Sequence, residues 1–514
     1  MMNKRQARFT CLAALTAAFL IAAGWMKAQT HGAKKRTAAT RKIAAPSPFA
    51  CSGNVTVTFG PTVPGDGLLS AQSDSDCFGW AEFVALNWPA SGSGFGNPAD
   101  LSAVQWETYM QAELMYPPNG AKPPPWGSTG GAIPSGCQVS PSLRAEVGRK
   151  VRILKSASKL VSSTGEGFTI PGIQQAYPQN APAWLGAQSA GNVWYEVILN
   201  KDIYDFVTAP SNQFYNATMQ DSKVNDGTGE PIVFPKGSLT GSPTGAIEMK
   251  AAWMEVPNYN PAAPGKWAKY KLSTAVVIGP TNNQCRTVTV ALVGLHIIHK
   301  TGSQPTWIWA TFEHVDNVPG PNQTSDCCNF NATSCQTRQV TVPEASCLGP
   351  GQTSPVTVSC TPNTSPPYYL GPGCPAPVPI QITRTVQLDS NATAANQAMW
   401  TAIGHAYPTS VFRYYQLVDV LWSTNPTQDP TLPQKVPLNP HSLTSGNPGR
   451  VFNTTLESYF QSSQCTDCHR YATIAPQSAN LPWDSDFSFA FGTASPATAG
   501  LSSRASRRIK PVRY

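Results

Sequence analysis

The sequence predicts an α+β fold in which a large β-rich N-terminal domain is followed by a smaller helical C-terminal region. Runs of β-forming residues recur between residues 192 and 314, whereas apolar residues adopt helical spacing after Asn391. The chain has 514 residues, with 40 Gly, 48 Pro and 12% charged residues. This composition is typical of a loop-rich globular protein, and a chain of this length holds about two to four domains.

The N-terminal residues have the layout of an export signal. Basic residues come first, an apolar run follows at 11–23, and small residues at 23–28 offer a cleavage site. The apolar run is short for a membrane-spanning helix, which needs roughly 20 residues, so cleavage is favoured over retention as an anchor. We therefore expect a signal peptide at 1–28, a linker at 29–75, and a location in the periplasm or outside a bacterial cell.

Basic residues are concentrated in the two tails of the chain. Fourteen Lys and Arg lie in the first 45 and last 11 residues, which hold no acidic residue, so the formal charge of +8 becomes −6 for residues 46–503. The basic tail at 504–514 is expected to be solvated, with contact to an anionic membrane surface as the alternative. No nucleic-acid-binding face is indicated, and no segment after the signal is apolar enough to span a bilayer.

The chain contains 13 cysteines. One lies in the predicted signal peptide and two lie in the motif described below, which leaves ten, an even number that predicts disulfide bonds in an exported protein. Six of the ten fall in the stretch 320–380, which has too little apolar content to fold by burial alone. We expect this stretch to be a disulfide-held excursion from the β-rich domain, which spans 76–385.

Hydrophobic periodicity predicts the individual elements. In the β-rich domain, helices are expected at 77–88 and 101–116, and strands at 192–199, 246–256, 272–278, 287–298 and 307–314. The last two strands flank the loop HKTGSQPT and therefore predict a hairpin. In the region 386–503, helices are expected at 394–403, 410–421 and 454–468. Thr454 is predicted to cap the last helix, with Glu457 completing a capping box.

Residues 465–469 read Cys-Thr-Asp-Cys-His, which is the CxxCH attachment signature of haem c. Two thiols form thioethers with the vinyl groups of the porphyrin, and the spacing lets both sulfurs reach one porphyrin edge. The adjacent histidine supplies the proximal nitrogen to the iron. The sequence thus predicts one covalent haem held by Cys465 and Cys468, with His469 as the metal ligand, in the helical region 386–503.

Three other interpretations of the motif are open. A redox CxxC of the thioredoxin type should follow a strand and begin a helix, whereas this motif is predicted to end a helix. Half of a zinc site would need a second CxxC or a close HxxxH pair, and neither follows. The third interpretation is a disulfide loop with an incidental histidine. The export signal favours haem, because covalent haem attachment takes place outside the bacterial cytoplasm.

Four segments carry a family resemblance, at 77–90, 245–253, 293–317 and 453–472. With them the chain resembles the large exported bacterial proteins of the cytochrome c family that have a single C-terminal CxxCH. The resemblance spans most of residues 77–472 and implies a haem-binding role for Cys465, Cys468 and His469, but no particular reaction. The chain departs from small cytochromes c because no methionine follows His469, so the usual sixth ligand is missing.

A sixth iron ligand must therefore come from upstream. His299 and His314 are the leading candidates, followed by Met399 and His405, although each is more often a structural residue. If the two strands of the hairpin pair, His296 is expected to share a face with His314.

On the same expectation, His299 shares the opposite face with Trp307 and Trp309. A separate metal site from His296, Glu313 and His314 is a weaker hypothesis. The candidates to pack on a porphyrin face are Trp307, Trp309, Trp400 and Trp422. The candidates to pair with its propionates are Arg413 and Arg470.

Three functions remain open at this point. The first is an exported c-type cytochrome that passes electrons to an unknown redox-partner protein. The second is a haem-dependent redox enzyme, of oxidase or peroxidase type, with a substrate site in the β-rich domain. The third is a surface binding module with a structural or sensory haem. The large size of the β-rich domain keeps the second and third functions open, and no GxSxG, P-loop or dinucleotide motif is present.

Overall fold

The computed structural model describes residues 49–51, 55–91, 94–128, 151–154, 182–228, 230–278, 285–320, 328–371, 373–424, 426, 440–441, 451–461, 464–469, 472, 474–475 and 485–496. The predicted signal peptide and the basic tail at 504–514 lie outside these residues. In the part of the chain that is described, no helix has both the length and the apolar composition needed to cross a bilayer.

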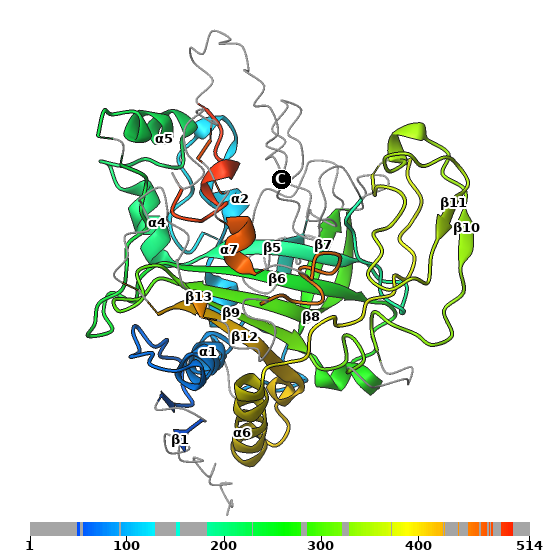
Figure 1. Cartoon of the computed structure of the whole chain (residues 1–514), viewed down its shortest axis with the longest axis horizontal. Helices are drawn as coiled ribbons and strands as arrows, with labels where there is room; N and C mark the ends of the chain where they lie inside the picture. The colour runs from blue at the N-terminus through cyan, green and yellow to red at the C-terminus, as the bar shows by residue number, and fades with distance from the viewer. Residues whose placement is uncertain are drawn as a thin grey trace, which may run out of the picture. The chain divides into compact units, whose positions relative to one another are not determined.

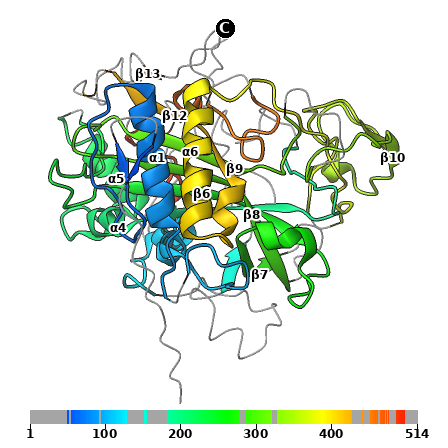
Figure 2. The same cartoon turned by 90° about the horizontal axis from the view of Figure 1, so that it is seen from below.

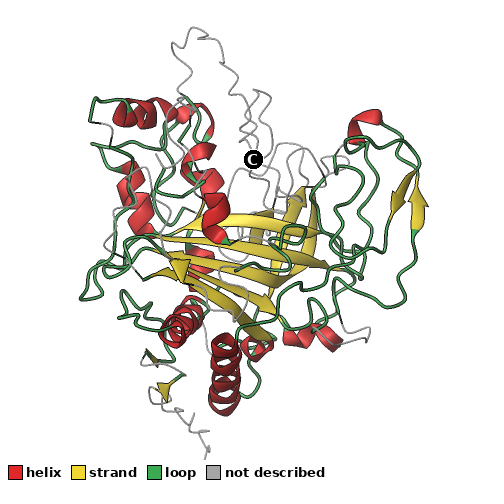
Figure 3. Ribbon diagram, viewed as in Figure 1, coloured by secondary structure: helices red, strands yellow, loops and turns green. Residues whose placement is uncertain are grey.

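Nine strands in the described residues form one large sheet (Figures 1 and 3). Its main path runs β13–β12–β9–β8–β6–β5–β3, and β7 pairs with both β8 and β4. Neighbours are antiparallel except β4 and β7, which are parallel. The strands are β3 Met110–Gln111, β4 Val151–Leu154, β5 Val193–Leu199, β6 Ile247–Val256, β7 Leu272–Ile278, β8 Cys285–His299, β9 Ile308–His314, β12 Tyr415–Ser423 and β13 Pro440–His441.

The five predicted strands are confirmed as β5 to β9, each within two residues at either end. The predicted hairpin is also confirmed, because β8 and β9 pair antiparallel across the intervening loop. These strands were predictable because they are rich in β-branched and aromatic residues, which suit a pleated and buried surface.

Two long helices cover one face of the sheet side by side (Figure 2). They are α1, Gln72–Leu86, and α6, Ser390–Ala406, and they confirm the helices predicted at 77–88 and 394–403. Asp389 caps α6 by accepting a hydrogen bond from the backbone N–H of Asn391. Between helices and sheet lies an aromatic core in which the ring of Phe83 stacks on that of Phe312 at 4.4 Å.

The other face of the sheet carries shorter elements. These are α2, Ala112–Met115, α4, Lys201–Thr208, α5, Ala217–Val224, and α7, Cys465–His469. In Figure 1 they lie above the sheet, whereas α1 and α6 lie below it. A second apolar cluster joins them to the sheet through Ile298 and Trp309. The predicted helix at 101–116 is wrong in extent, since only a 3-10 turn at Gln105–Thr108 and the four residues of α2 are helical.

Strand β12 corrects the predicted helix at 410–421. Residues 411–414 form a 3-10 turn, and the chain then enters the sheet beside β9. The strand is buried almost throughout, and a short, continuously apolar segment cannot be assigned to helix or strand from periodicity alone. The α+β class holds, but the sheet takes strands from both sides of the predicted boundary at 385, so a separate helical C-terminal region is not observed.

The predicted linker at 29–75 is wrong from residue 49 onward, as far as its residues are described. The side chains of Val57 and Phe59 are buried against the α1 side of the sheet, and β1, Phe49–Ala50, pairs with β2, Thr56–Val57. A disulfide joins Cys51 to Cys77 in α1. Alternating apolar residues and a cysteine therefore attach this segment to the folded unit despite its linker-like composition.

The Cys-rich stretch projects from the main sheet as a separate hairpin of β10, Arg338–Val340, and β11, Val356–Val358 (Figure 1). Disulfides join Cys335 to Cys360 and Cys347 to Cys374. Cys285 and Cys328 are also disulfide-bonded. The predicted disulfides are thus present, and they hold a stretch with little regular structure. Further 3-10 turns occur at Pro118–Gly120, Gly265–Lys269, Ala345–Cys347 and Phe491–Thr493.

Two carboxyl groups are buried together between α1 and β12. The side-chain amide of Gln72 donates to Oδ1 of Asp76 and to Oδ1 of Asp419, each at 2.9 Å. Within the described residues, the Oδ2 atoms of both aspartates lack a hydrogen-bond partner. Burial raises the pKa of Asp76 to about 8, and the negative charge of Asp389 adds to this rise. Burial and the charge of Asp76 also raise the pKa of Asp419.

We expect the free energy of unfolding to fall as pH rises from about 4 to about 8. The folded protein keeps a proton on Asp76 that the unfolded chain releases near the ordinary pKa of 3.8, so the unfolded state gains stability as protons become scarce. Asp76→Asn should flatten this slope, whereas the exposed control Asp205→Asn should leave it unchanged. Urea unfolding at pH 5 and pH 8 measures both, and an unaltered slope in Asp76→Asn would contradict the prediction.

Candidate haem-attachment site

The CxxCH motif forms α7, a single helical turn that begins at Cys465 and ends at His469. Residues four apart share a helix face, so the thiol and the imidazole are directed to the same side. The helix predicted at 454–468 is wrong, because residues 454–461 form turns. The motif therefore begins a helix, as a thioredoxin-type CxxC does. However, the described residues directly before it, at 451–461 and 464, form no strand that would lead into the helix.

The predicted capping box is displaced by one residue. Oε2 of Glu457 accepts a hydrogen bond from the backbone N–H of Asn453 at 2.7 Å, and Oδ1 of Asn453 accepts from the N–H of Thr455. Thr454 instead donates through its hydroxyl to Oε2 of Glu313 at 2.7 Å. The capping residues serve a tight turn on the sheet rather than the start of a long helix.

The imidazole of His469 is oriented by a backbone carbonyl. Nδ1 lies 2.7 Å from the oxygen of Phe487, which can only accept, so Nδ1 carries the proton and Nε2 keeps its lone pair. Burial lowers the pKa of His469 to about 4; the Phe487 carbonyl opposes this, and the charges of Lys250 and His296 add to it. At neutral pH the ring is therefore uncharged, which is the form that binds a metal.

A strained turn places that carbonyl. Asp486 and Phe487 have φ values of 53° and 65°, in the left-handed region that non-glycine residues rarely adopt. The carboxylate of Asp486 holds the turn by accepting from Nζ of Lys300 at 2.5 Å and from the N–H of Phe234 at 2.9 Å. The indole of Trp307 donates to the carbonyl of Asp486 at 3.1 Å.

Apolar and aromatic residues surround the motif. The ring of His469 lies 4.7 Å from that of Trp309 and 4.8 Å from that of Phe489. Cys465 is half-buried at the edge of the second apolar cluster, with its Sγ 3.9 Å from the carbonyl of Val451. The side chain of Cys468 lies outside the described part of α7.

Buried polar atoms without a hydrogen-bond partner occur at several places among the described residues, and some of them lie in or near the motif. Among the described residues, these include Nε1 of Trp309, Oγ1 of Thr466 and Oγ of Ser485, all in residues that are at most 3% exposed. Such atoms are rare in folded proteins and indicate a missing partner. With the neutral imidazole and the half-buried thiol, they fit a haem c: Cys465 and Cys468 would attach the porphyrin, and His469 would bind iron through Nε2.

The sheet holds the chain that leads into the motif. The amide of Asn453 donates to Oγ1 of Thr311 at 3.1 Å and to the carbonyl of Phe312 at 2.6 Å. Gly294 on β8 permits this approach, since a Cβ there would lie 2.2 Å from Oγ1 of Thr455. The turn at 453–455 is thus pressed onto the face of the sheet below α7.

None of the four predicted sixth ligands lies beside α7. His299 and Met399 belong to the other face, where Nδ1 of His299 meets Oε1 of Glu82 on α1 at 2.5 Å and its Nε2 meets the carbonyl of Thr244 at 2.9 Å. His405 lies in the last turn of α6 on that same face.

His314 stacks on Tyr270 at 3.7 Å, and both of its ring nitrogens are bonded to backbone groups, those of Lys269 and Asp316. Its side chain is therefore fixed in a structural role. Buried histidines with two partners cannot be told from ligands by sequence, because both environments favour the same residue type.

The prediction of which side chains share a face of the β8–β9 hairpin is wrong, because the register differs by one residue from the expected one. His296 pairs with Thr311, and His299 pairs with Ile308, so His296 shares its face with Trp309 whereas His299 shares its face with His314. Trp307 lies before β9 with a φ of 72°. Because side chains alternate along a strand, a one-residue change of register exchanges the two faces.

The hypothesis of a metal site from His296, Glu313 and His314 is not supported. Glu313 forms a buried ion pair with Arg384 and accepts from Gln416, and His314 points to the opposite face. Nε2 of His296 lies 3.1 Å from Oε1 of Glu457. In the described residues no cluster of three His, Cys, Asp or Glu side chains could hold a metal ion.

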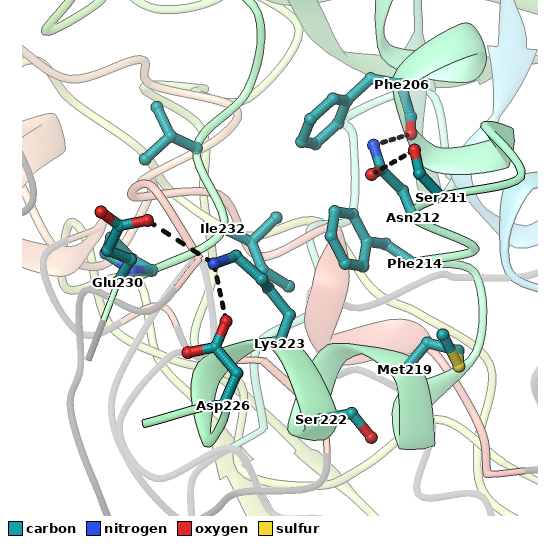
Figure 4. Close-up of a pocket in the computed structure, with 12 residues that line it drawn as sticks. Phe206, Ser211, Asn212, Phe214, Met219, Ser222, Lys223, Asp226, Glu230 and Ile232 are labelled. Atoms are coloured by element: carbon teal, nitrogen blue, oxygen red, sulfur yellow. Dashed lines mark hydrogen bonds and ion pairs between the residues drawn. The ribbon is translucent and has the colours of Figure 1, made fainter. Parts of the chain in front are cut away.

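A groove of about 630 Å³ opens beside α5 (Figure 4). Phe206, Phe214 and Ile232 line its apolar part, and at the other end Lys223 pairs with Asp226 at 3.0 Å and with Glu230 at 3.6 Å. No motif pointed to this groove. A series of aromatic rings connects it to His469, with centroid distances of 5.7 Å for Phe206–Phe234, 5.9 Å for Phe234–Trp307, 6.5 Å for Trp307–Trp309 and 4.7 Å for Trp309–His469.

The chain matches no protein-family model, and no curated protein or solved structure is significantly similar to it. Its function must therefore be inferred from the residues of the site. Sequence reasoning missed the carbonyl of Phe487 and the amide of Asn453. The carbonyl could not be found from the sequence, since the strained turn at Asp486 and Phe487 carries no Gly or Asn to mark it.

We expect Gly294→Ala to loosen the segment that leads into α7. The added methyl group would displace Thr455, and overpacking of this kind costs about 1–3 kcal/mol of stability. Gly404→Ala on α6 is the matched control, because a Cβ there meets atoms no nearer than 4.0 Å. Thermal unfolding and amide hydrogen exchange of residues 453–461 measure the effect; equal behaviour of the two variants would contradict it.

Proposed function

We propose that this chain is an exported c-type cytochrome that carries one haem and transfers electrons to a redox-partner protein. Cys465 and Cys468 form the two thioethers, and His469 is an iron ligand. The observation that carries the proposal is the arrangement of His469, which follows the second cysteine on one helical turn and has its Nδ1 proton bound by the carbonyl of Phe487. This leaves Nε2 to the iron.

The disulfides support an exported location, in the periplasm or outside the cell. The disulfides of the described residues include Cys51–Cys77, Cys335–Cys360 and Cys347–Cys374, and the last two hold the Cys-rich hairpin. Disulfides persist in oxidising compartments, which are also where haem is attached to CxxCH motifs. One exported chain can therefore both form disulfides and receive a covalent haem in the same compartment.

The groove beside α5 favours a second candidate function, a haem-dependent redox enzyme of oxidase or peroxidase type. Its volume of about 630 Å³ is in the range of small-molecule sites, and it combines apolar walls with a charged end. The series of aromatic rings places it on the same side of the sheet as α7. An enzyme would also need an iron coordination position open to its oxidant.

We expect the mature protein, produced in a host that makes cytochromes c, to keep its haem after denaturation. Haem staining of a denaturing gel and intact mass should show one haem per chain. Cys465→Ala with Cys468→Ala should abolish both signals. The control pair Cys347→Ala with Cys374→Ala removes a disulfide elsewhere and should keep the haem. A wild-type mass without a haem increment would refute the proposal.

The absorption spectrum distinguishes the two candidate functions. We expect a low-spin reduced form with sharp α and β bands that does not react with carbon monoxide, because electron transfer requires no open iron position. A high-spin ferric form that binds carbon monoxide or peroxide would instead favour the redox enzyme. His469→Ala should change the spectrum in either case, while the thioethers remain.

A further inference from the structure

Trp309 is the exception among the buried tryptophans. Of the eight in the described residues, seven donate an indole hydrogen bond, and Trp309 does not, although it is only 3% exposed. A buried donor without an acceptor is costly, so its presence indicates an acceptor that the protein itself does not supply.

The position of Trp309 narrows the chemistry of that acceptor. Its ring lies 4.7 Å from the ring of His469, so with a haem on α7 it would lie on the side that the imidazole occupies. A small molecule bound to such a haem from the opposite side would be out of its reach. A haem on α7 would bring its own acceptors to this position, and the strong acceptors of haem are its two propionate carboxylates.

The charges of the same sheet face also suit a carboxylate. Glu248, Ile298 and Trp309 form one cross-strand row, and Lys250 and His296 belong to the next. Lys250 shares its face with Trp309 and lies one cross-strand row away from it. Glu248 in the first row already accepts from the hydroxyl of Ser488 at 2.6 Å. A cation and a neutral donor thus lie below α7.

We propose that the indole N–H of Trp309 donates a hydrogen bond to a propionate of the haem held by α7, with Lys250 supplying the neighbouring positive charge. This inference rests on the proposed function. It replaces Arg413 as a propionate partner, since that guanidinium donates to the carbonyl of Pro408 beside α6, on the other face. Trp309 would act as a positioning residue, which fixes the tilt and the potential of the cofactor.

The test begins with intact mass of the wild type, Trp309→Phe and the control Trp400→Phe. The indole of Trp400 donates to the carbonyl of Tyr415 on the opposite face, so its loss should not reach the haem. All three proteins should carry one covalent haem. Wild-type protein without haem would refute the proposed function itself, which separates that failure from a failure of the present inference.

Two measurements on haem-loaded protein then decide the inference. The Trp309 indole proton should exchange with solvent at least about tenfold more slowly than in the Cys465→Ala, Cys468→Ala variant, because hydrogen bonds to charged groups are strong. Trp309→Phe should lower the midpoint potential relative to wild type and Trp400→Phe, since a propionate without its donor stabilises ferric iron. Covalent haem with an unchanged potential in Trp309→Phe would overturn the inference, and this readout needs only loaded protein.

Discussion

The antiparallel register between β8 and β9 is the constraint on which the site depends. It places Ile298 opposite Trp309 and His299 opposite Ile308, so successive side chains face opposite layers. One layer receives His299, whose ring bonds to Glu82 on α1, and the other receives Trp309, whose ring meets His469. A shift of one residue would bury the wrong set on each face, and the cysteine motif would then meet Ile308 and Ala310 in place of Trp309.

The described residues after 450 have little regular structure apart from α7, and buried side chains hold them on that face. Glu313 is buried and serves as one anchor, through Arg384 and both the N–H and the hydroxyl of Thr454. Asn453 is a second anchor, with two donated and two accepted hydrogen bonds. Asp486 is a third, through Lys300. Each anchor is a buried polar contact between this segment and a strand or a loop that joins two strands, so the sheet acts as a template for the segment.

The sequence predicted the sheet better than it predicted what lies on it. Strands such as β6 and β8 are long and rich in β-forming residues, and both are observed where expected. The helix predicted at 410–421 is wrong because most of it belongs to β12, a short and almost fully buried segment with no polar face to reveal its period. The motif at 465–469 was visible because covalent chemistry demands particular residues at a particular spacing. The orientation of His469 was not, since it depends on a carbonyl contributed by Phe487, 18 residues further along.

The carbonyl of Phe487 fixes the orientation of the His469 ring, which the CxxCH motif alone does not. Two consecutive residues, Asp486 and Phe487, hold left-handed conformations that cost free energy, on the order of 1–3 kcal/mol each. The ion pair of Asp486 with Lys300, both almost fully buried, is what retains the turn. Because these contacts form within the protein, the imidazole has its tautomer and direction before any cofactor is attached. If the proposed haem binds through Nε2, the ring would need no change of tautomer, because the carbonyl of Phe487 already fixes it.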